Sequence, residues 1–189
     1  MKKNHYSVVT LSFTAMMAAM VYVVTMFRFP LLGSKVHFAN AVCLLGGLLL
    51  GPVQGGLAAG LGSALYDAIA GGYGLADVLV TFVSKFAMGW VCGAIMHKTG
   101  KGKLRIDRTV LAAVAGALTY VALYMLKTFI FGLIAGNGWA AVISKFPASI
   151  INAGAAIVAA PVFFHAVLPA LKSSGALRYL HPAETAGKA

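Results

Sequence analysis

Apolar residues fill most of the chain in long runs, which short polar or glycine-rich segments interrupt at intervals. A helix rises 1.5 Å per residue, so a charge-free run of about 20 residues is long enough to cross a bilayer. The run from Val8 to Phe27 meets this requirement, and no polar segment with a small-residue cleavage site follows it. It is therefore predicted to be a transmembrane helix and not a signal peptide.

The second charge-free stretch, from Val36 to Tyr66, is too long for a single crossing. Gly51-Pro52 lies near its middle and predicts a break, because proline restricts the residue before it and favours the start of a new helix. We expect a short helix over about 38–50, which need not span the bilayer by itself, and a second helix over about 53–70. The preceding segment, Arg28 to His37, is predicted to be a loop.

The rest of the chain contains three more apolar runs, which predict helices over about 77–97, 109–134 and 141–168. Glycine-rich or polar segments separate these runs. The expected fold class is therefore an all-α integral membrane protein, a bundle of six transmembrane helices. One domain covers residues 1–170, and a short polar cytoplasmic tail covers 171–189.

Composition agrees with this pattern: 60% of the 189 residues are hydrophobic and only 10% are charged. Soluble domains carry about 25% charged residues, so this chain has too little polar surface to be one of them. The formal net charge of +11 would also suit a nucleic-acid-binding protein. However, most of the basic residues form short clusters between apolar runs and no continuous basic face, so no nucleic-acid partner is expected.

The basic clusters instead predict an orientation, since lysine and arginine are retained on the cytoplasmic side of a membrane. With the N-terminus inside and six crossings, one side of the membrane receives ten basic residues and the other receives two, Arg28 and Lys35. Both termini are therefore predicted to be cytoplasmic. The ten residues on the cytoplasmic side are Lys2, Lys3, Lys98, Lys101, Lys103, Arg105, Arg108, Lys172, Arg178 and Lys188.

Small residues recur at helical spacing and predict where helices pack closely. The third predicted helix has a nearly continuous small face, made of Gly55, Gly56, Ala59, Gly60, Ser63 and Ala64. The fourth carries Gly89 and Gly93. The first carries Ala15 and Ala19, which also have a four-residue spacing.

Three lysines lie inside or just within the ends of apolar helices: Lys85, Lys127 and Lys145. A charge within a membrane helix costs roughly 2.5 kcal/mol or more, so a binding or ion-pairing role is the first hypothesis. The alternative is that the long side chains extend to the lipid headgroups, which suits Lys145 best. Asp67, near the outer end of its helix, is the expected partner for one of these lysines.

The predicted topology places these charged residues, with Asn152, in the outward half of the bundle, and Asn40 and Tyr124 fall at the same depth. We therefore predict a solute pocket in that half, and its excess of lysine over acid favours a cargo with an acidic or hydrogen-bond-accepting group. The candidate substrate-binding residues are Asn40, Asp67, Lys85, Tyr124, Lys127, Lys145 and Asn152.

The sequence contains no motif of a known catalytic or nucleotide-binding site. Cys43 and Cys92 lack the spacing of a metal or redox site, and His37 has no second ligand at suitable spacing. No catalytic activity, metal or cofactor is therefore predicted. Any active transport must draw its energy from another subunit or from an ion gradient.

Four segments in order suggest a family: His37-Phe38-Ala39-Asn40-Ala41, the run from Gly46 to Pro52, Tyr66-Asp67, and the run from Lys85 to Gly89. This order resembles the substrate-specific (S) components of energy-coupling-factor (ECF) transporters, over about residues 8–168. Within that family it is most similar to the riboflavin-type and hydroxymethylpyrimidine- or pyridoxine-type subunits.

The resemblance implies a subunit of a bacterial plasma-membrane importer that captures a small vitamin or vitamin precursor from outside. It also implies three protein partners, a transmembrane coupling protein and two cytoplasmic ATPases. Family members dock through an Ala-x-x-x-Ala pattern on the first helix, which Ala15 and Ala19 match. Close relatives often have an aspartate where this chain has Asn40, so the identity of the cargo stays open.

A stand-alone secondary transporter or channel for a small solute is the alternative. Such proteins often have internal repeats and coupling sites at the bilayer midplane. The two halves of this sequence show no convincing repeat, and the polar groups favour one side of the membrane.

Overall fold

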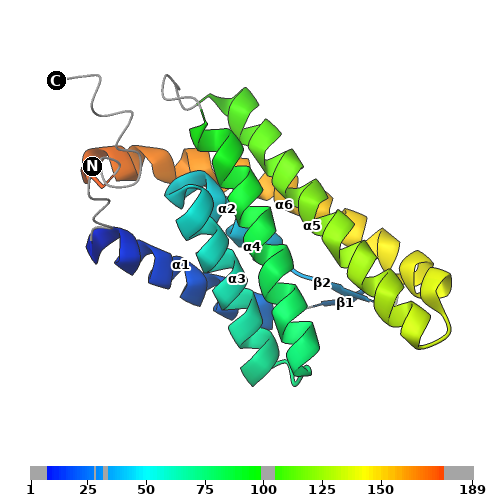
Figure 1. Ribbon diagram of the computed structural model, residues 1–189. Helices are drawn as coiled ribbons and strands as arrows, with labels where there is room; N and C mark the ends of the chain where they lie inside the picture. The colour runs from blue at the N-terminus through cyan, green and yellow to red at the C-terminus, as the bar shows by residue number, and fades with distance from the viewer. Residues whose placement is uncertain (1–7, 28, 32–33, 99–104, 177–189) are drawn as a thin grey trace.

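The computed structural model describes residues 8–27, 29–31, 34–98 and 105–176. These residues form six helices and one short hairpin (Figure 1). In order the elements are α1 (Val8–Met26), β1 (Phe29–Leu31), β2 (Ser34–Val36), α2 (Ala39–Leu50), α3 (Pro52–Ile69), α4 (Leu75–His97), α5 (Ile106–Ile134) and α6 (Gly138–Ser173). The predicted all-helical fold with six helices is confirmed. Most helix ends lie within three residues of their expected positions, but α6 continues past 168 to Ser173.

The segment between α1 and α2 differs from the prediction of a loop. Its two strands pair in antiparallel register, with Phe29 opposite Val36 and Leu31 opposite Ser34. Each strand has three residues, which is too short for an alternating pattern to be visible in the sequence. A two-stranded hairpin also leaves both strands at an edge, where a proline such as Pro30 is tolerated.

The helices differ in length as the apolar runs predict. Among the described residues, α1, α4, α5 and α6 are long and apolar enough to cross a membrane. In contrast, α2 has 12 residues, or about 18 Å of helix, and is too short to span a bilayer alone. The predicted break at Gly51-Pro52 is confirmed, and Gly51 has a φ of 82°, a conformation that favours glycine.

The short helix α2 lies at the centre of the bundle, and every one of its residues is buried. It contacts each of the other five helices. A helix that is apolar all round is expected to be buried among other helices. Its side chains pack against Met88, Cys92 and Phe164, which are fully buried on α4 and α6.

Four glycines let α2, α3 and α4 approach at backbone distance, and we call them the glycine seam: Gly47, Gly55, Gly89 and Gly93. A Cβ atom at Gly47 would lie 2.6 Å from the carbonyl oxygen of Gly89, and one at Gly55 would lie 2.6 Å from the Cα of Gly47. Helices in membranes associate through such small residues. The predicted close packing at Gly55, Gly89 and Gly93 is therefore confirmed.

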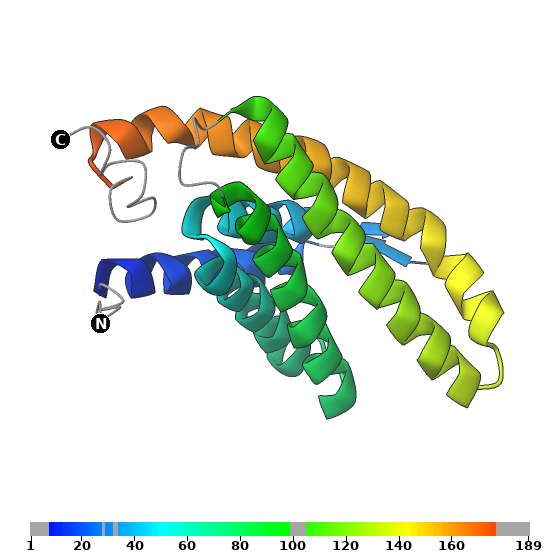
Figure 2. The same ribbon diagram turned by 45° about the horizontal axis from the view of Figure 1, so that its top comes forward.

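The bundle is open at one end. In Figure 2, α3 and α4 run together on one side and α5 and α6 run together on the other, with the hairpin beside α6. The beginning of α1 and the end of α6 lie at the other end of the molecule, near the end of α4 and the beginning of α5 (Figure 1). This arrangement places both termini of the described bundle on one side.

Which side of the bundle faces the cytoplasm stays a prediction. Of the residues counted for orientation, seven lie outside the described residues: Lys2, Lys3, Arg28, Lys101, Lys103, Arg178 and Lys188. The part of the predicted tail after residue 176 lies outside them as well.

Candidate functional site

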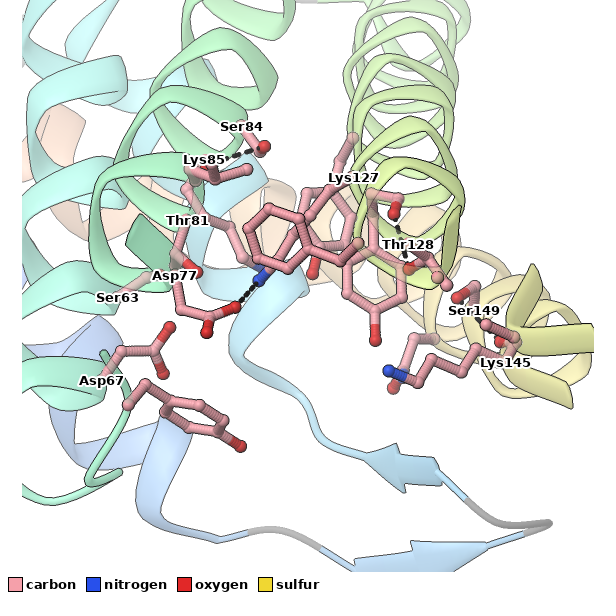
Figure 3. Close-up of a pocket in the computed structure, with 18 of the residues that line it drawn as sticks. Ser63, Asp67, Asp77, Thr81, Ser84, Lys85, Lys127, Thr128, Lys145 and Ser149 are labelled. Atoms are coloured by element: carbon pink, nitrogen blue, oxygen red, sulfur yellow. Dashed lines mark hydrogen bonds and ion pairs between the residues drawn. The ribbon is translucent and has the colours of Figure 1, made fainter. Parts of the chain in front are cut away.

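A cavity of about 810 Å³ lies at the open end of the bundle. This volume is within the usual range of 300–1,000 Å³ for small-molecule sites. The cavity is lined by the second halves of α3 and α5, the first halves of α4 and α6, Thr25 at the end of α1, and His37 after the hairpin (Figure 3). Because neighbouring helices run in opposite directions, all these half-helices lie at the same end of the molecule.

The structure brings the predicted substrate-binding residues together. Six of them line the cavity: Asp67, Lys85, Tyr124, Lys127, Lys145 and Asn152. The seventh, Asn40, lies behind the cavity wall, where its side-chain oxygen accepts a hydrogen bond from Lys85. The two alanines predicted to dock a partner, Ala15 and Ala19, lie away from this site on an exposed face of α1.

Lys85 is the most deeply buried charge near the cavity, with only 4% of its surface exposed. Its ammonium group donates a hydrogen bond to Asn40 Oδ1 and lies 3.9 Å from the centre of the Tyr120 ring. The amide dipole and the face of the ring both stabilise the positive charge in an apolar setting. Asn40 on α2, which carries no charge itself, thus accepts a hydrogen bond from the charged Lys85 on α4.

Lys127 forms an ion pair with Asp77 across α4 and α5, with 2.6 Å between Nζ and Oδ1. Lys127 therefore has Asp77 as its partner, and the pairing of Asp67 with one of the lysines stays a prediction. Asp77 lies in the first turn of α4, where the helix dipole favours a carboxylate. The side chains of Lys127 and Asp77 are 17% and 33% exposed, so the pair lies at the rim of the cavity.

Asn152 connects α6 to the hairpin. Its Oδ1 accepts a hydrogen bond from the backbone N–H of His37 at 2.9 Å, one residue after β2 ends. The Asn152 side chain is 8% exposed. This contact holds the segment between β2 and α2 against the cavity wall.

Aromatic rings on α5 form a flat part of the wall. Tyr120 and Tyr124 are stacked, with ring centres 5.8 Å apart and planes inclined by 21°. Phe131 lines the cavity two turns further on, with its ring centre 5.5 Å from Lys127 Nζ. Stacked rings with cations beside them suit a planar ligand that carries hydrogen-bond acceptors.

Several lining residues were not singled out from the sequence. They are Thr81 and Ser84 on α4, Thr128 and Phe131 on α5, and Ser149 on α6. The sequence contains a pattern that points to them, because each of these helices carries polar or aromatic residues at spacings of three and four. On α5 these residues are Tyr120, Tyr124, Lys127, Thr128 and Phe131, which lie on one face of the helix.

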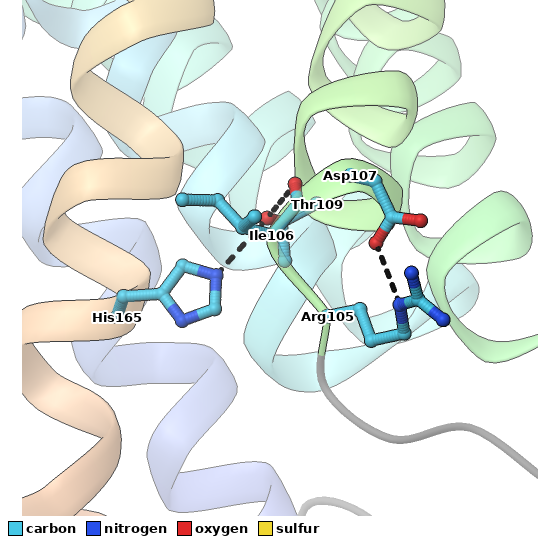
Figure 4. A network of polar contacts seen from close by, with 5 residues as sticks. All are labelled: Arg105, Ile106, Asp107, Thr109 and His165. Carbon is cyan, nitrogen blue, oxygen red and sulfur yellow. Dashed lines mark hydrogen bonds and ion pairs between the residues drawn. The ribbon is translucent and has the colours of Figure 1, made fainter.

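A second group of polar side chains lies at the opposite end of the bundle (Figure 4). Thr109 on α5 contacts His165 Nε2 on α6 at 3.1 Å and donates to the carbonyl oxygen of Ile106 at 2.8 Å. Arg108 donates two hydrogen bonds to the carbonyl oxygen of Ile95, near the end of α4. These contacts join helix ends, and none of these residues lines the cavity.

No group of three or more histidines, cysteines or acidic residues that could hold a metal ion occurs among the described residues.

The sequence matches the model of a known protein family. The model for the S component of ECF-type riboflavin transporters matches residues 5–168. No curated protein matches the sequence.

Proposed function

The chain belongs to the family of ECF-type riboflavin transporter S components, and from this premise we propose that its cavity binds riboflavin. As an S component it is a multi-pass membrane protein that binds substrate and has no catalytic activity of its own. The observation that carries the proposal is the aromatic and cationic wall that α4 and α5 present to the cavity.

The planar ring system of riboflavin suits the α5 wall. Tyr120, Tyr124 and Phe131 offer apolar ring surface, and stacking of aromatic rings contributes about 0.5–1.5 kcal/mol beyond burial of area. Lys85 lies over Tyr120 and is close enough to the wall to donate to a carbonyl oxygen of the bound ring. A buried donor of this kind gives specificity, since it favours a ligand that carries an acceptor at this position.

The polyhydroxyl chain of riboflavin suits the polar rim. Asp67 and Asp77 provide acceptors, and the hydroxyls of Thr81 and Thr128 serve as donors or acceptors. Asn152 acts from the other side, because it holds the segment at His37 against the cavity. We propose that the remaining predicted residues, Lys127 and Lys145, also belong to this rim.

We propose that the cavity opens to the outside of a bacterial plasma membrane. The excess of basic residues at the other end of the bundle supports this orientation. In it, Lys98, Arg105 and Arg108 lie on the cytoplasmic side, and the substrate enters from the side that the cavity faces.

The proposed partners are a transmembrane coupling protein and two cytoplasmic ATPases, as the family implies. Ala15 and Ala19 are exposed on α1, so they do not serve the internal packing of the bundle. Small residues at such spacing let a partner helix approach closely. Replacing both with leucine is expected to abolish uptake into cells that carry the partners, with riboflavin binding unchanged; loss of binding, or normal uptake, would contradict the docking role.

Titration calorimetry on the purified chain in detergent tests the proposed ligand. We expect riboflavin to bind without ATP, and Lys127→Met and Asn152→Ala each to weaken binding by more than tenfold. The matched control is Lys98→Met, which removes an exposed lysine at the opposite end of the bundle and should leave binding unchanged. An absence of riboflavin binding, or equal binding by all four proteins, would reject the proposal.

A further inference from the structure

Lys85 lies at the deep end of the cavity, away from the Lys127–Asp77 pair at the rim. On α4 it comes eight residues after Asp77, which is roughly 12 Å of helix. On α5, which runs in the opposite direction, Tyr120 comes seven residues before Lys127 and so lies at a similar depth. The 3.9 Å between the Lys85 ammonium group and the centre of the Tyr120 ring agrees with this placement. Both residues line the cavity.

Asn40 holds Lys85 from behind the cavity wall. Its Oδ1 accepts a hydrogen bond from the ammonium group of Lys85. Asn40 is only 1% exposed and does not itself line the cavity. It belongs to α2, which is buried along its whole length and contacts all five other helices, so its place in the bundle is fixed. An effect of Asn40 on a bound ligand is therefore expected to pass through Lys85.

The partner of Lys85 differs in charge from the partner of Lys127. Asp77 is a carboxylate and neutralises Lys127, whereas the amide of Asn40 and the ring of Tyr120 stabilise the charge of Lys85 without cancelling it. An ammonium group has three N–H donors, and the hydrogen bond to Asn40 uses one of them. A charged donor makes a stronger hydrogen bond than a neutral donor, above all in a buried site. This arrangement suits a neutral acceptor such as a ring carbonyl.

We propose that Asn40 is a positioning residue for ligand recognition, and that Lys85, held in this way, recognises a carbonyl oxygen of the bound ring. The inference rests on the proposed function, because that function places the ring of riboflavin on the α5 wall. The ring enters with its carbonyl edge toward Lys85, and the polyhydroxyl chain stays at the rim. The site thus selects neutral planar ligands by the acceptor at their inner edge.

A double-mutant cycle tests whether Asn40 acts through Lys85. Dissociation constants for riboflavin are measured by calorimetry on the full chain in detergent, at a temperature at which every variant is folded. Asn40→Ala and Lys85→Met are each expected to weaken binding by more than fivefold. In the Lys85→Met background, Asn40→Ala should change the affinity by less than twofold, because the group that Asn40 positions is absent. Equal losses in both backgrounds, or no loss in Asn40→Ala alone, would overturn the inference.

A second measurement separates charge from shape. Asn40→Asp keeps the size of the side chain, but its carboxylate would neutralise Lys85 and compete with the ligand for its donors. The ligands are riboflavin and its 2-thio and 4-thio analogues, in which sulfur, a weak acceptor, replaces one carbonyl oxygen. The wild-type chain is expected to bind one analogue at least fivefold more weakly than riboflavin. Asn40→Asp and Lys85→Met should each reduce this difference to less than twofold.

A loss of stability alone would weaken the binding of all three flavins alike and leave their ratios unchanged. The inference is therefore overturned if the wild-type chain binds the three flavins equally, or if the difference survives in either variant. In both cases riboflavin still binds, and the proposed function stands. If the wild-type chain binds none of the three, the riboflavin proposal fails and this inference fails with it.

Discussion

At the scale of single residues, the site depends on how each buried charge is compensated. Lys85 has a neutral partner in Asn40, so the pair carries a net positive charge into the bundle. Lys127 has a carboxylate partner in Asp77, so that pair is neutral. The two lysine charges are thus held in different ways, Lys85 by an amide oxygen and Lys127 by a carboxylate.

The Lys85–Asn40 contact leads to a prediction about stability. Asn40→Ala removes the side-chain acceptor of a buried ammonium group, and hydrogen bonds to charged groups contribute about 1.5–3 kcal/mol. We expect the free energy of unfolding, measured without ligand in detergent, to fall by about that amount. The control is Asn137→Ala, since Asn137 is exposed and its side chain makes no capping hydrogen bond to α6. Equal stability of the two variants would show that Asn40 does not hold Lys85.

At the scale of helices, the bundle consists of a tightly packed part and a more open part. In the first, α2, α3 and α4 meet along the glycine seam at distances that leave no room for a Cβ atom. In the second, α5 and α6 diverge from α3 and α4 around the cavity (Figure 2). The cavity thus lies where α5 and α6 separate from α3 and α4.

The glycine seam is tested by adding a single methyl group. In Gly47→Ala the new Cβ atom would meet the backbone of Gly89 at 2.6 Å, and overpacking of this kind costs about 1–3 kcal/mol. The matched control is Gly154→Ala on α6, where a Cβ atom meets nothing within 4 Å. Because alanine is a better helix former, the control should unfold at the same temperature as the wild type or slightly above it. A Gly47→Ala protein as stable as the control would contradict close contact at the seam.

At the scale of the whole molecule, the cavity and the basic clusters lie at opposite ends. The start of α1 and the end of α6 lie at the end that carries the basic clusters, which we call the basic end. The hairpin and the turn between α5 and α6 lie at the cavity end (Figure 1). In the proposed orientation the cavity faces the outside and the basic end faces the cytoplasm, where the proposed ATPases lie. The orientation of the protein in the membrane therefore determines the direction of transport.

Labelling of introduced cysteines on intact cells checks the orientation. Ala76→Cys lies at the cavity end and Lys98→Cys at the basic end, and both positions are exposed. We expect a membrane-impermeant maleimide to label the first on intact cells and the second only after lysis. The native Cys43 and Cys92 are fully buried and should not react. Labelling of Lys98→Cys on intact cells would reverse the proposed orientation.

Four of the helices could be predicted because their apolar runs are long enough to cross a membrane, and α2 and α3 could be separated because the break at Gly51-Pro52 has a local cause. The partners of the charged residues were harder to predict. A sequence shows which residues share a face of one helix, but not which faces of two helices meet. For this reason Asp77 was not identified as the partner of Lys127, although both residues were visible as charges near helix ends. Nor was Asn40 identified as the partner of Lys85.

The glycine seam also determines which parts of this protein can change without loss of the fold. The shortest contact at each of its four glycines is to a backbone atom, and none of the four lines the cavity. Side chains of α5 and α6 that face the ligand can therefore be exchanged in a directed-evolution library while the seam glycines are kept. The seam would then serve as a constant scaffold on which binders of different solutes are selected.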